Sequence, residues 1–192
     1  MRKIVSFMHT SLDGLVAGPN GEMDWIHVDD EIFDYAGHMT DEADTALYGR
    51  VTFEIMESYW PTAADKPNAT KHDKQHAAWY KKVEKIVLSK TMQQSASANT
   101  RIISDNIATE IGLLKQQTGS KIVIFGSPGA VHSLMQLNLI DEFWLFVNPV
   151  IIGKGIPMFK DIPGKIKLKL LSAEALSSGV YGIHYAVEGN GS

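Results

Sequence analysis

The sequence from position 121 to 129 is Lys121-Ile-Val-Ile-Phe-Gly-Ser-Pro-Gly129, an apolar run that ends in glycines, a serine and a proline. Such a run is typical of a strand buried on both faces, as in a parallel sheet. Pro128 suits the first turn of a helix, and Val131, Leu134 and Met135 follow at helical spacing. The segment therefore predicts a strand, a glycine turn and a helix.

The same alternation precedes this segment and predicts a parallel sheet covered by helices. The expected strands are Ile4–Met8, Thr45–Tyr48, Lys85–Leu88 and Thr100–Ser104. The expected helices are 30–41, 52–59, 75–82 and 105–118, with Pro61 ending the second and Asp105 capping the fourth. Residues 61–74 are expected to form a surface loop.

The C-terminal part differs because only turns and loops separate its expected strands. These strands are Asp141–Val147, Ile166–Leu171 and Val180–Val187, and Ser178-Gly179 is expected to close the last hairpin. We therefore expect antiparallel pairing here.

The composition excludes several classes of protein. With 192 residues and 44% hydrophobic side chains, we expect one domain over residues 1–188 and a flexible tail at 189–192. The formal net charge is -4, without the cationic excess that nucleic-acid binding requires. The absence of cysteine excludes disulfides and thiolate metal sites. No apolar run reaches the roughly 20 residues of a membrane helix, so we expect no membrane partner and a cytoplasmic location.

Three strand ends carry residues that suit anions. Gly49–Thr52 and Gly126–Gly129 each bring free backbone N–H groups and a helix N-terminus to one point. Ser89 and Lys90 add a hydroxyl and a cation after another strand. Each segment alone is also consistent with a plain turn, and Arg50 with a surface pair to Glu54. The carboxyl ends of parallel strands share one edge, so the three segments together predict a phosphate-binding site.

Motifs along the chain resemble a known family. Leu47-Tyr-Gly-Arg-Val-Thr-Phe-Glu54 resembles a segment of dihydrofolate reductases, Val87-Leu-Ser89 their later strand end, and Phe125-Gly-Ser127 their glycine turn. The sequence is most similar to the C-terminal reductase domain of bifunctional riboflavin-biosynthesis enzymes and its stand-alone homologues. The further motifs of that group are Ser11-Leu-Asp-Gly14, Leu139-Ile-Asp-Glu142 and Pro149-Val-Ile-Ile-Gly-Lys-Gly155.

The resemblance implies a dihydrofolate-reductase-like three-layer α/β fold, with a mixed sheet of about eight strands, an antiparallel C-terminal part and helices on both faces. It also implies NADPH as the cofactor. The residues that it assigns to phosphate and ribose are Gly49, Arg50, Val51 and Thr52. It assigns Ser89 and Lys90 to the 2′-phosphate, together with Leu88 at the end of the preceding strand. It assigns the pyrophosphate to Gly126, Ser127, Pro128 and Gly129.

Asp30 is the catalytic residue that the resemblance suggests. Met23-Asp-Trp25 resembles the Met-Pro-Trp of bacterial dihydrofolate reductases, and counting onward places Asp30 at their pterin-binding carboxylate. Hydride transfer to a C=N bond needs a proton on nitrogen, so we expect a partly buried acid with a raised pKa. Asp30 is equally suited to cap a helix, and Asp29 is its rival for the catalytic role.

Asp13 and Trp25 each allow a functional and a structural interpretation. By the resemblance, Asp13 lies near the nicotinamide end of the cleft and is a second catalytic candidate, but Asp13-Gly14 is also an ordinary turn pair. Trp25 is expected to pack beside nicotinamide or substrate, or else in the core. His72 and His76 share a helical face, but we expect no metal there because their segment is polar, is predicted to be exposed and lacks a third ligand.

These features predict an NADPH-dependent reductase of a small heterocycle, pteridine-like or aminopyrimidine, of riboflavin or folate type. The alternative is a nucleotide- or ligand-binding protein that keeps the fold without turnover. Riboflavin-pathway reductases commonly carry an acid and a second glycine where this chain has Phe125 and Ser127, so the substrate stays open. The apolar side chains of Phe143, Trp144, Phe146 and Pro149–Ile152 suggest a homodimer surface.

Overall fold

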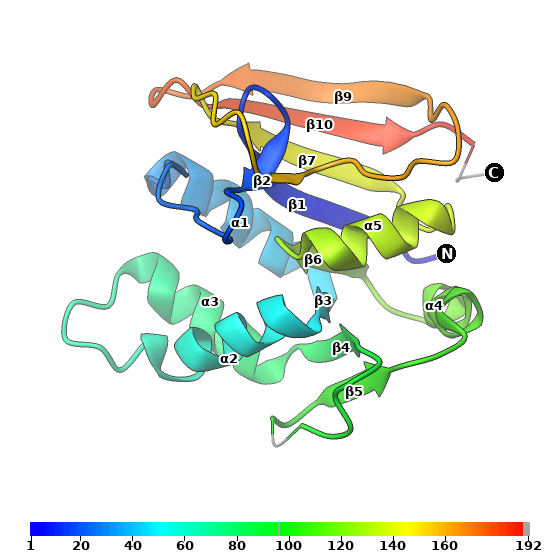
Figure 1. The fold of residues 1–192 in the computed structure, drawn as a ribbon. Helices are drawn as coiled ribbons and strands as arrows, with labels where there is room; N and C mark the ends of the chain where they lie inside the picture. Colours follow the sequence, from blue (N-terminus) through cyan, green and yellow to red (C-terminus); the bar gives the residue numbers. More distant parts are fainter. Residues whose placement is uncertain (96, 190–192) are drawn as a thin grey trace.

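The computed structural model describes residues 1–95 and 97–189, so the end of the expected tail, 190–192, lies outside the described residues. An 8-stranded sheet in the order β5-β4-β3-β6-β1-β7-β10-β9 forms the middle layer (Figure 1). Its strands are β1 (Ile4–Thr10), β3 (Ala43–Gly49), β4 (Glu84–Leu88), β5 (Thr100–Ile103), β6 (Lys121–Phe125), β7 (Glu142–Val147), β9 (Leu168–Ala175) and β10 (Tyr181–Val187). A second, small sheet pairs β2 (Leu15–Ala17) with β8 (Ile156–Pro157).

The large sheet is mixed, as predicted. Strands from β5 to β7 pair in parallel, because the connections between the neighbouring strands cross over through helices or longer segments. β10 pairs antiparallel with both β7 and β9. The β9–β10 hairpin closes where the Leu176 and Val180 backbones bond and Gly179 has a φ of +84°, which confirms the expected turn.

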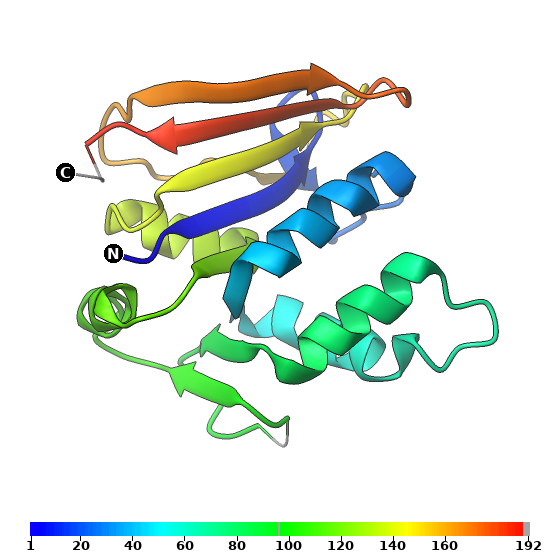
Figure 2. The same cartoon turned by 180° about the vertical axis from the view of Figure 1, so that it is seen from behind.

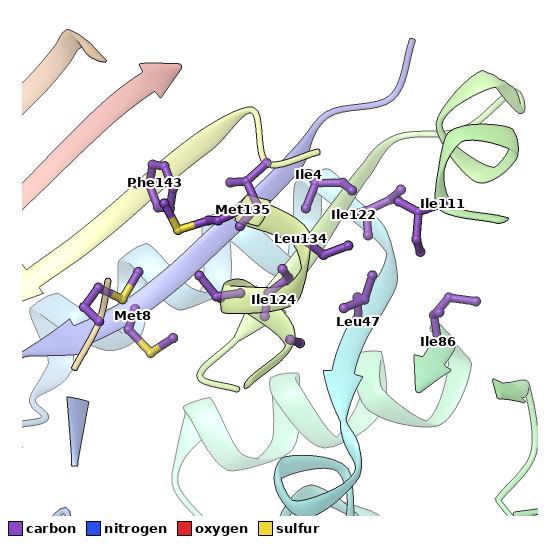
Figure 3. Close-up of a cluster of buried hydrophobic side chains, with 14 of the residues drawn as sticks. Ile4, Met8, Leu47, Ile86, Ile111, Ile122, Ile124, Leu134, Met135 and Phe143 are labelled. Carbon is purple, nitrogen blue, oxygen red and sulfur yellow. The ribbon is translucent and has the colours of Figure 1, made fainter. Parts of the chain in front are cut away.

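Helices cover both faces of the sheet. They are α1 (Asp30–Glu42), α2 (Arg50–Ala63), α3 (Lys71–Lys82), α4 (Ile107–Gln116) and α5 (Pro128–Gln136). α4 and α5 lie on one face (Figure 1), and α1 and α3 lie on the other (Figure 2). β6 shows how the sequence divides the core, because Ile122 and Ile124 pack against α4 and α5 (Figure 3) while Val123 and Phe125 pack on the α1 side.

Two expectations for the region after β3 are wrong. α2 continues through Pro61 to Ala63, because a proline so close to a helix end removes little of the hydrogen-bond ladder. The expected loop at 61–74 is shorter, because α3 begins at Lys71. Thr70 and Asp73 form a capping box there, in which each side chain accepts from the other residue's backbone N–H.

The start of α4 also differs from the prediction. Its N-cap is Asn106, in the left-handed conformation with a φ of +51°, and not Asp105. The Asp105 carboxylate accepts a hydrogen bond from the Ser104 hydroxyl instead. α4 ends at Gln116, before the predicted stop, and β9 runs from Leu168 to Ala175 where 166–171 was expected.

The expected apolar dimer surface is only partly present. Phe143 and Phe146 are 1% and 0% exposed, because both side chains belong to the core. Ile151 is 69% exposed, as the prediction requires. The edge strand β9 is exposed along its whole length.

Two ion pairs, of which only Lys115–Asp141 is buried on both sides, lie at the amino-terminal ends of the central strands. Lys115 Nζ lies 2.7 Å from Asp141, whose carboxylate also accepts from the Ile4 amide at 2.7 Å. Glu142 bonds Lys3 and His184, and hydrogen bonding to these partners lowers the pKa of Glu142 to about 2. The acids of the 139–142 motif are thus structural. Among the described residues, no helix is long and apolar enough to cross a membrane.

Candidate functional site

Three of the predicted anion-binding segments lie side by side. The strand order β4-β3-β6 places their carboxyl ends together, and Gly49 pairs in register with Leu88. The Gly49 amide donates to the Ser127 hydroxyl at 2.6 Å, which ties the β3 turn to the β6 turn. Ser89 and Lys90 follow Leu88 directly, so the third segment adjoins the first.

Two helix N-termini meet at this point without side-chain caps. α2 has Gly49 as its N-cap, and its first turn contains no acidic residue. α5 has Ser127 as its N-cap and Pro128 in its first turn, and Gly126 and Ser127 both have positive φ values, of 65° and 61°. Unsatisfied N–H groups and two helix dipoles therefore converge on one place, which suits the pyrophosphate of a dinucleotide.

The predicted side chains have partners of their own. Arg50 is exposed and binds Glu54 through Nη1, at 2.8 and 2.9 Å to the two carboxylate oxygens. The Ser89 hydroxyl accepts from the amides of Thr91 and Met92 and lies 3.4 Å from the Thr91 hydroxyl, so a bound phosphate would compete with Thr91 for its proton. Lys90 is exposed beside it.

A largely apolar pocket of about 360 Å³ begins at the same turns. Thr52 and residues 126–128 line one end of it, so the pocket is continuous with the anion-binding turns. The other walls come from the ends of β1 and β2, the loop before α1, and the helices α1, α2 and α3. The described lining residues are Phe7, Met8, His9, Val16, Ala17, Met23, Ile26, Val28, Ile32, Phe33, Ala36, Thr52, Ile55, Met56, Trp60, His72, His76, Phe125, Gly126, Ser127 and Pro128.

Asp30 is exposed at the first position of α1 and does not line this pocket. The expectation of a partly buried acid at this position is wrong, because the helix turns the Asp30 side chain to solvent. Asp29 is the N-cap, and its carboxylate accepts from the Ile32 amide at 2.9 Å. Burial opposes ionisation of Asp29, but the bonds from the Ile32 amide and His27 help to outweigh it and lower the pKa.

Asp13 and Trp25 also lie outside the pocket lining. Asp13 is exposed in the turn between β1 and β2, where it accepts from the amides of Ile152 at 3.3 Å and Gly153 at 2.8 Å. It therefore joins two of the family-like motifs to each other. Trp25 is partly buried, and its indole N–H donates to the Glu22 carbonyl at 3.3 Å. The catalytic role of Asp30 and Asp13 and the substrate-binding role of Trp25 stay predictions.

His9 is a pocket residue that the sequence reasoning missed. Burial lowers the pKa of His9 to about 4, so its ring is neutral at pH 7. Asn148 Nδ2 lies 3.4 Å from His9 Nδ1, and its two hydrogens also face the carbonyls of Phe146 at 3.0 Å and Thr10 at 3.3 Å. The alternation of Val5, Phe7 and His9 along β1 was the available signal, because it places His9 on the α1 face of the sheet.

The aromatic wall of the pocket was also missed. His76 is 5% exposed, stacks on Trp60 with ring centroids 3.9 Å apart, and has both ring nitrogens buried without a hydrogen-bond partner. His72 stacks on Phe33 at 3.9 Å. The expectation that this segment is exposed is wrong, because α3 turns both histidines toward α1 and α2. Burial lowers the pKa of both, to about 3 for His76.

In the part of the chain that the structure describes, His72 and His76 do not belong to a metal-binding cluster. Among the described residues, no three His, Cys, Asp or Glu side chains come close enough together to hold a metal ion. A larger hollow of about 690 Å³, lined by Arg2, Lys82 and Arg101, lies at the opposite end of the sheet from the predicted anion-binding turns, and Arg2 and Arg101 are paired there with Asp44 and Glu110. The apolar pocket is therefore the better candidate for chemistry.

Comparison with known proteins links this arrangement to reductases. Residues 2–181 match the family model described as the RibD C-terminal domain. The uncharacterized protein YyaP of Bacillus subtilis (strain 168) is 33% identical over 189 residues, which cover 96% of this chain and 94% of that protein.

Solved structures share the fold. A putative riboflavin biosynthesis protein from Shewanella sp. PV-4 has a TM-score of 0.73 at 20% identity, covering 97% of this chain and 99% of that one. A deaminase and 5-amino-6-(5-phosphoribosylamino)uracil reductase from Thermotoga maritima has 0.66 at 15%, covering 97% and 56%. Dihydrofolate reductase from Enterococcus faecalis, complexed with NADP(H), has 0.62 at 15%, covering 97% and 96%. The expected dihydrofolate-reductase-like fold is confirmed.

Proposed function

Because the chain belongs to the RibD C-terminal domain family, we propose that it is an NADPH-dependent reductase of a small heterocyclic substrate, pteridine-like or aminopyrimidine. The observation that carries this proposal is the junction of two uncapped helix N-termini, tied by the Gly49–Ser127 bond, at the end of an apolar pocket. A bound dinucleotide needs an anion-binding site for its pyrophosphate and, next to it, an apolar site for its reactive ring.

The residues at the strand ends fit the cofactor. The backbone amides of residues 50–52 and of Gly129 would bind the pyrophosphate, because helix starts present such N–H groups to an anion. Arg50 would exchange its exposed bond with Glu54 for a phosphate, and the Ser89 hydroxyl and Lys90 would bind the 2′-phosphate. When bound, NADPH supplies the hydride.

The pocket residues would orient the substrate and exclude water. His9 lines the pocket, and its neutral ring would form a hydrogen bond with a polar atom of the substrate. Hydride addition to a C=N or C=O bond requires a matching proton, which reaches the substrate from solvent. Asp30, which is exposed and lies outside the described pocket lining, is retained as the predicted catalytic carboxylate and would relay this proton from solvent.

One observation favours the alternative, a ligand-binding protein without turnover. Among the described lining residues there is no carboxylate, so a dedicated acid is not part of the pocket wall. Oxidation of NADPH measured with dihydrofolate, pterins, aminopyrimidine precursors of flavins and simple imines separates the two functions. Turnover with at least one substrate supports the reductase, whereas NADPH binding without turnover across the panel supports the alternative.

A cytoplasmic homodimer is part of the same proposal. The exposed edge strand β9 supports it, because Leu168, Leu170 and Leu171 are 37%, 53% and 45% exposed on an unpaired edge. Sedimentation of the wild type and of Leu170→Lys tests it. We expect a dimer that the lysine weakens, and a monomeric wild type would contradict the dimer.

A further inference from the structure

The pocket is walled on one side by two stacked pairs of rings. Trp60 of α2 stacks on His76 of α3, and Phe33 of α1 stacks on His72 of α3, each with centroids 3.9 Å apart. Trp60 also meets His72 edge to face at 5.7 Å, so the two pairs form one continuous wall. Three different helices supply these rings, and flat aromatic faces favour a flat aromatic ligand.

The described lining of the pocket contains no Lys, Arg, Asp or Glu. Its titratable side chains are His9, His72 and His76, and burial lowers the pKa of all three, to about 4 for His9 and about 3 for His76. At pH 7 the wall is therefore electrically neutral. A phosphate or carboxylate placed inside would lose its hydration and find no cation to pair with.

The entrance of the pocket is apolar as well. Met23, Val28 and Ile55 line it and are 49%, 46% and 49% exposed. Hydrophobic side chains exposed together at the edge of a cavity favour contact with an apolar ligand. A charged substituent of the ligand that passed these side chains would form no ion pair or hydrogen bond with them.

We propose that the substrate of this pocket is a neutral, planar aromatic ring system without phosphate or carboxylate. The inference rests on the proposed reductase function and narrows its substrate. Trp60 and His76 set the preference for a flat ring, and Ile55 and Met23 set the preference against charge. The chain then differs in specificity from the phosphoribosylamino-uracil reductase whose fold it shares.

The affinities of 2-naphthol and 2-naphthyl phosphate test this proposal, because the two probes share the same planar naphthalene system and differ by one phosphate group. Binding is followed by isothermal calorimetry at pH 7.5 and constant ionic strength, with inorganic pyrophosphate in excess so that the phosphate ester cannot bind through the predicted anion site at Thr52 and residues 126–128. We expect 2-naphthol to bind at least about tenfold more tightly, and Trp60→Ala to weaken it by about tenfold. Equal or tighter binding of the phosphate ester, no binding of 2-naphthol, or binding unaffected by Trp60→Ala would overturn the proposal.

A charge placed at the entrance provides the matched control. Ile55→Lys puts a cation on exposed α2 surface without disturbing the core, and should reduce the discrimination against the phosphate ester by about threefold or more. Leu113→Lys makes the same kind of change on α4, where Leu113 is 54% exposed, and should leave the ratio unchanged. If the ratio of the 2-naphthol affinity to the phosphate-ester affinity were the same in Ile55→Lys and Leu113→Lys, the probes would not bind beside Ile55, and the proposed substrate pocket would be contradicted.

NADPH affinity measured on the same proteins separates this inference from the proposed function. A protein that prefers 2-naphthol but does not bind NADPH would contradict the reductase function alone. A protein that binds NADPH and prefers the phosphate ester would contradict the substrate class alone.

Discussion

The amide of Gly49 donates a hydrogen bond of 2.6 Å to the hydroxyl of Ser127. These residues are the N-caps of α2 and α5, so one hydrogen bond fixes the positions of two helix N-termini relative to each other. Ser127 adopts a φ of +61°, a conformation that favours glycine. The serine hydroxyl thus offsets a strained backbone by binding a neighbouring amide.

Substitution of Ser127 separates these two effects. Ser127→Ala keeps the unfavourable φ and leaves the Gly49 amide without its partner, so we expect a loss of about 1–2 kcal/mol of unfolding free energy. Ser127→Gly loses the same bond but relieves the backbone, and should lie within about 1 kcal/mol of the wild type. Urea unfolding measures both variants. An alanine variant as stable as the glycine variant would contradict this account.

Arg50 is held by Glu54 in the described structure, and we expect it to exchange that partner for the 2′-phosphate of NADPH, next to Ser89 and Lys90. Arg50→Ala should weaken NADPH binding by about tenfold and remove much of the preference over NADH, because a charge-assisted bond is lost. Glu54→Gln removes the competing carboxylate and should bind NADPH at least as tightly as the wild type. If Arg50→Ala left both affinities unchanged, Arg50 would be only a surface cation.

The strand, turn and helix geometry at Gly49 and Gly126 could be predicted from the sequence because its signal is local. Glycine at a strand end followed by helical spacing specifies a backbone shape, and Gly49 and Gly126 both take the expected places. The parallel order of β3, β4 and β6 then brings the turns together. Nothing beyond short-range pattern and general topology was needed for these residues.

The pocket could not be predicted in the same way, because its wall depends on how three helices meet. His76 looked exposed, since its neighbours in sequence are polar, yet α3 turns it against Trp60 of α2. Pro61 led us to expect an earlier end for α2, so the position of Trp60 within that helix was not predicted. Asp30 was assigned as the catalytic carboxylate by counting along the chain. Counting cannot distinguish the helix N-cap, which is Asp29, from the exposed first residue of the helix, which is Asp30.

Acid should destabilise the protein through its buried histidines. Burial lowers the pKa of His76 to about 3, so between that value and 6.5 the unfolded chain takes up a proton that the folded chain does not. Stability is therefore lost as the pH falls below 6.5. His76, and likewise His9 with its pKa lowered to about 4, should each cost about 2 kcal/mol between pH 7 and pH 5.

His76→Phe tests this prediction, because phenylalanine keeps a ring beside Trp60 without titrating. Urea unfolding at pH 7 and pH 5 should give a pH-dependent loss that is about 2 kcal/mol smaller than in the wild type. His38→Gln changes an exposed histidine on α1 and should retain the wild-type dependence. An unchanged pH dependence in His76→Phe would show that His76 is accessible to protons in the folded state.

His9 and Asp30 can be separated by turnover. His9 lines the pocket whereas Asp30 is exposed outside its lining, so we expect His9→Gln to lower kcat by about tenfold or more. Asp30→Asn should lower it by less, and binding of NADPH should be unchanged in both. A larger loss in Asp30→Asn, with NADPH still bound, would restore Asp30 as the principal catalytic group.

Titration of the wild-type protein with NADPH and with NADH, followed by isothermal calorimetry, tests the proposed reductase function most directly. We expect saturable binding of NADPH and binding of NADH at least about tenfold weaker, because Arg50, Ser89 and Lys90 present cations and a hydroxyl to phosphate beside two uncapped helix N-termini. The absence of detectable binding by either nucleotide would contradict the function proposed for this chain.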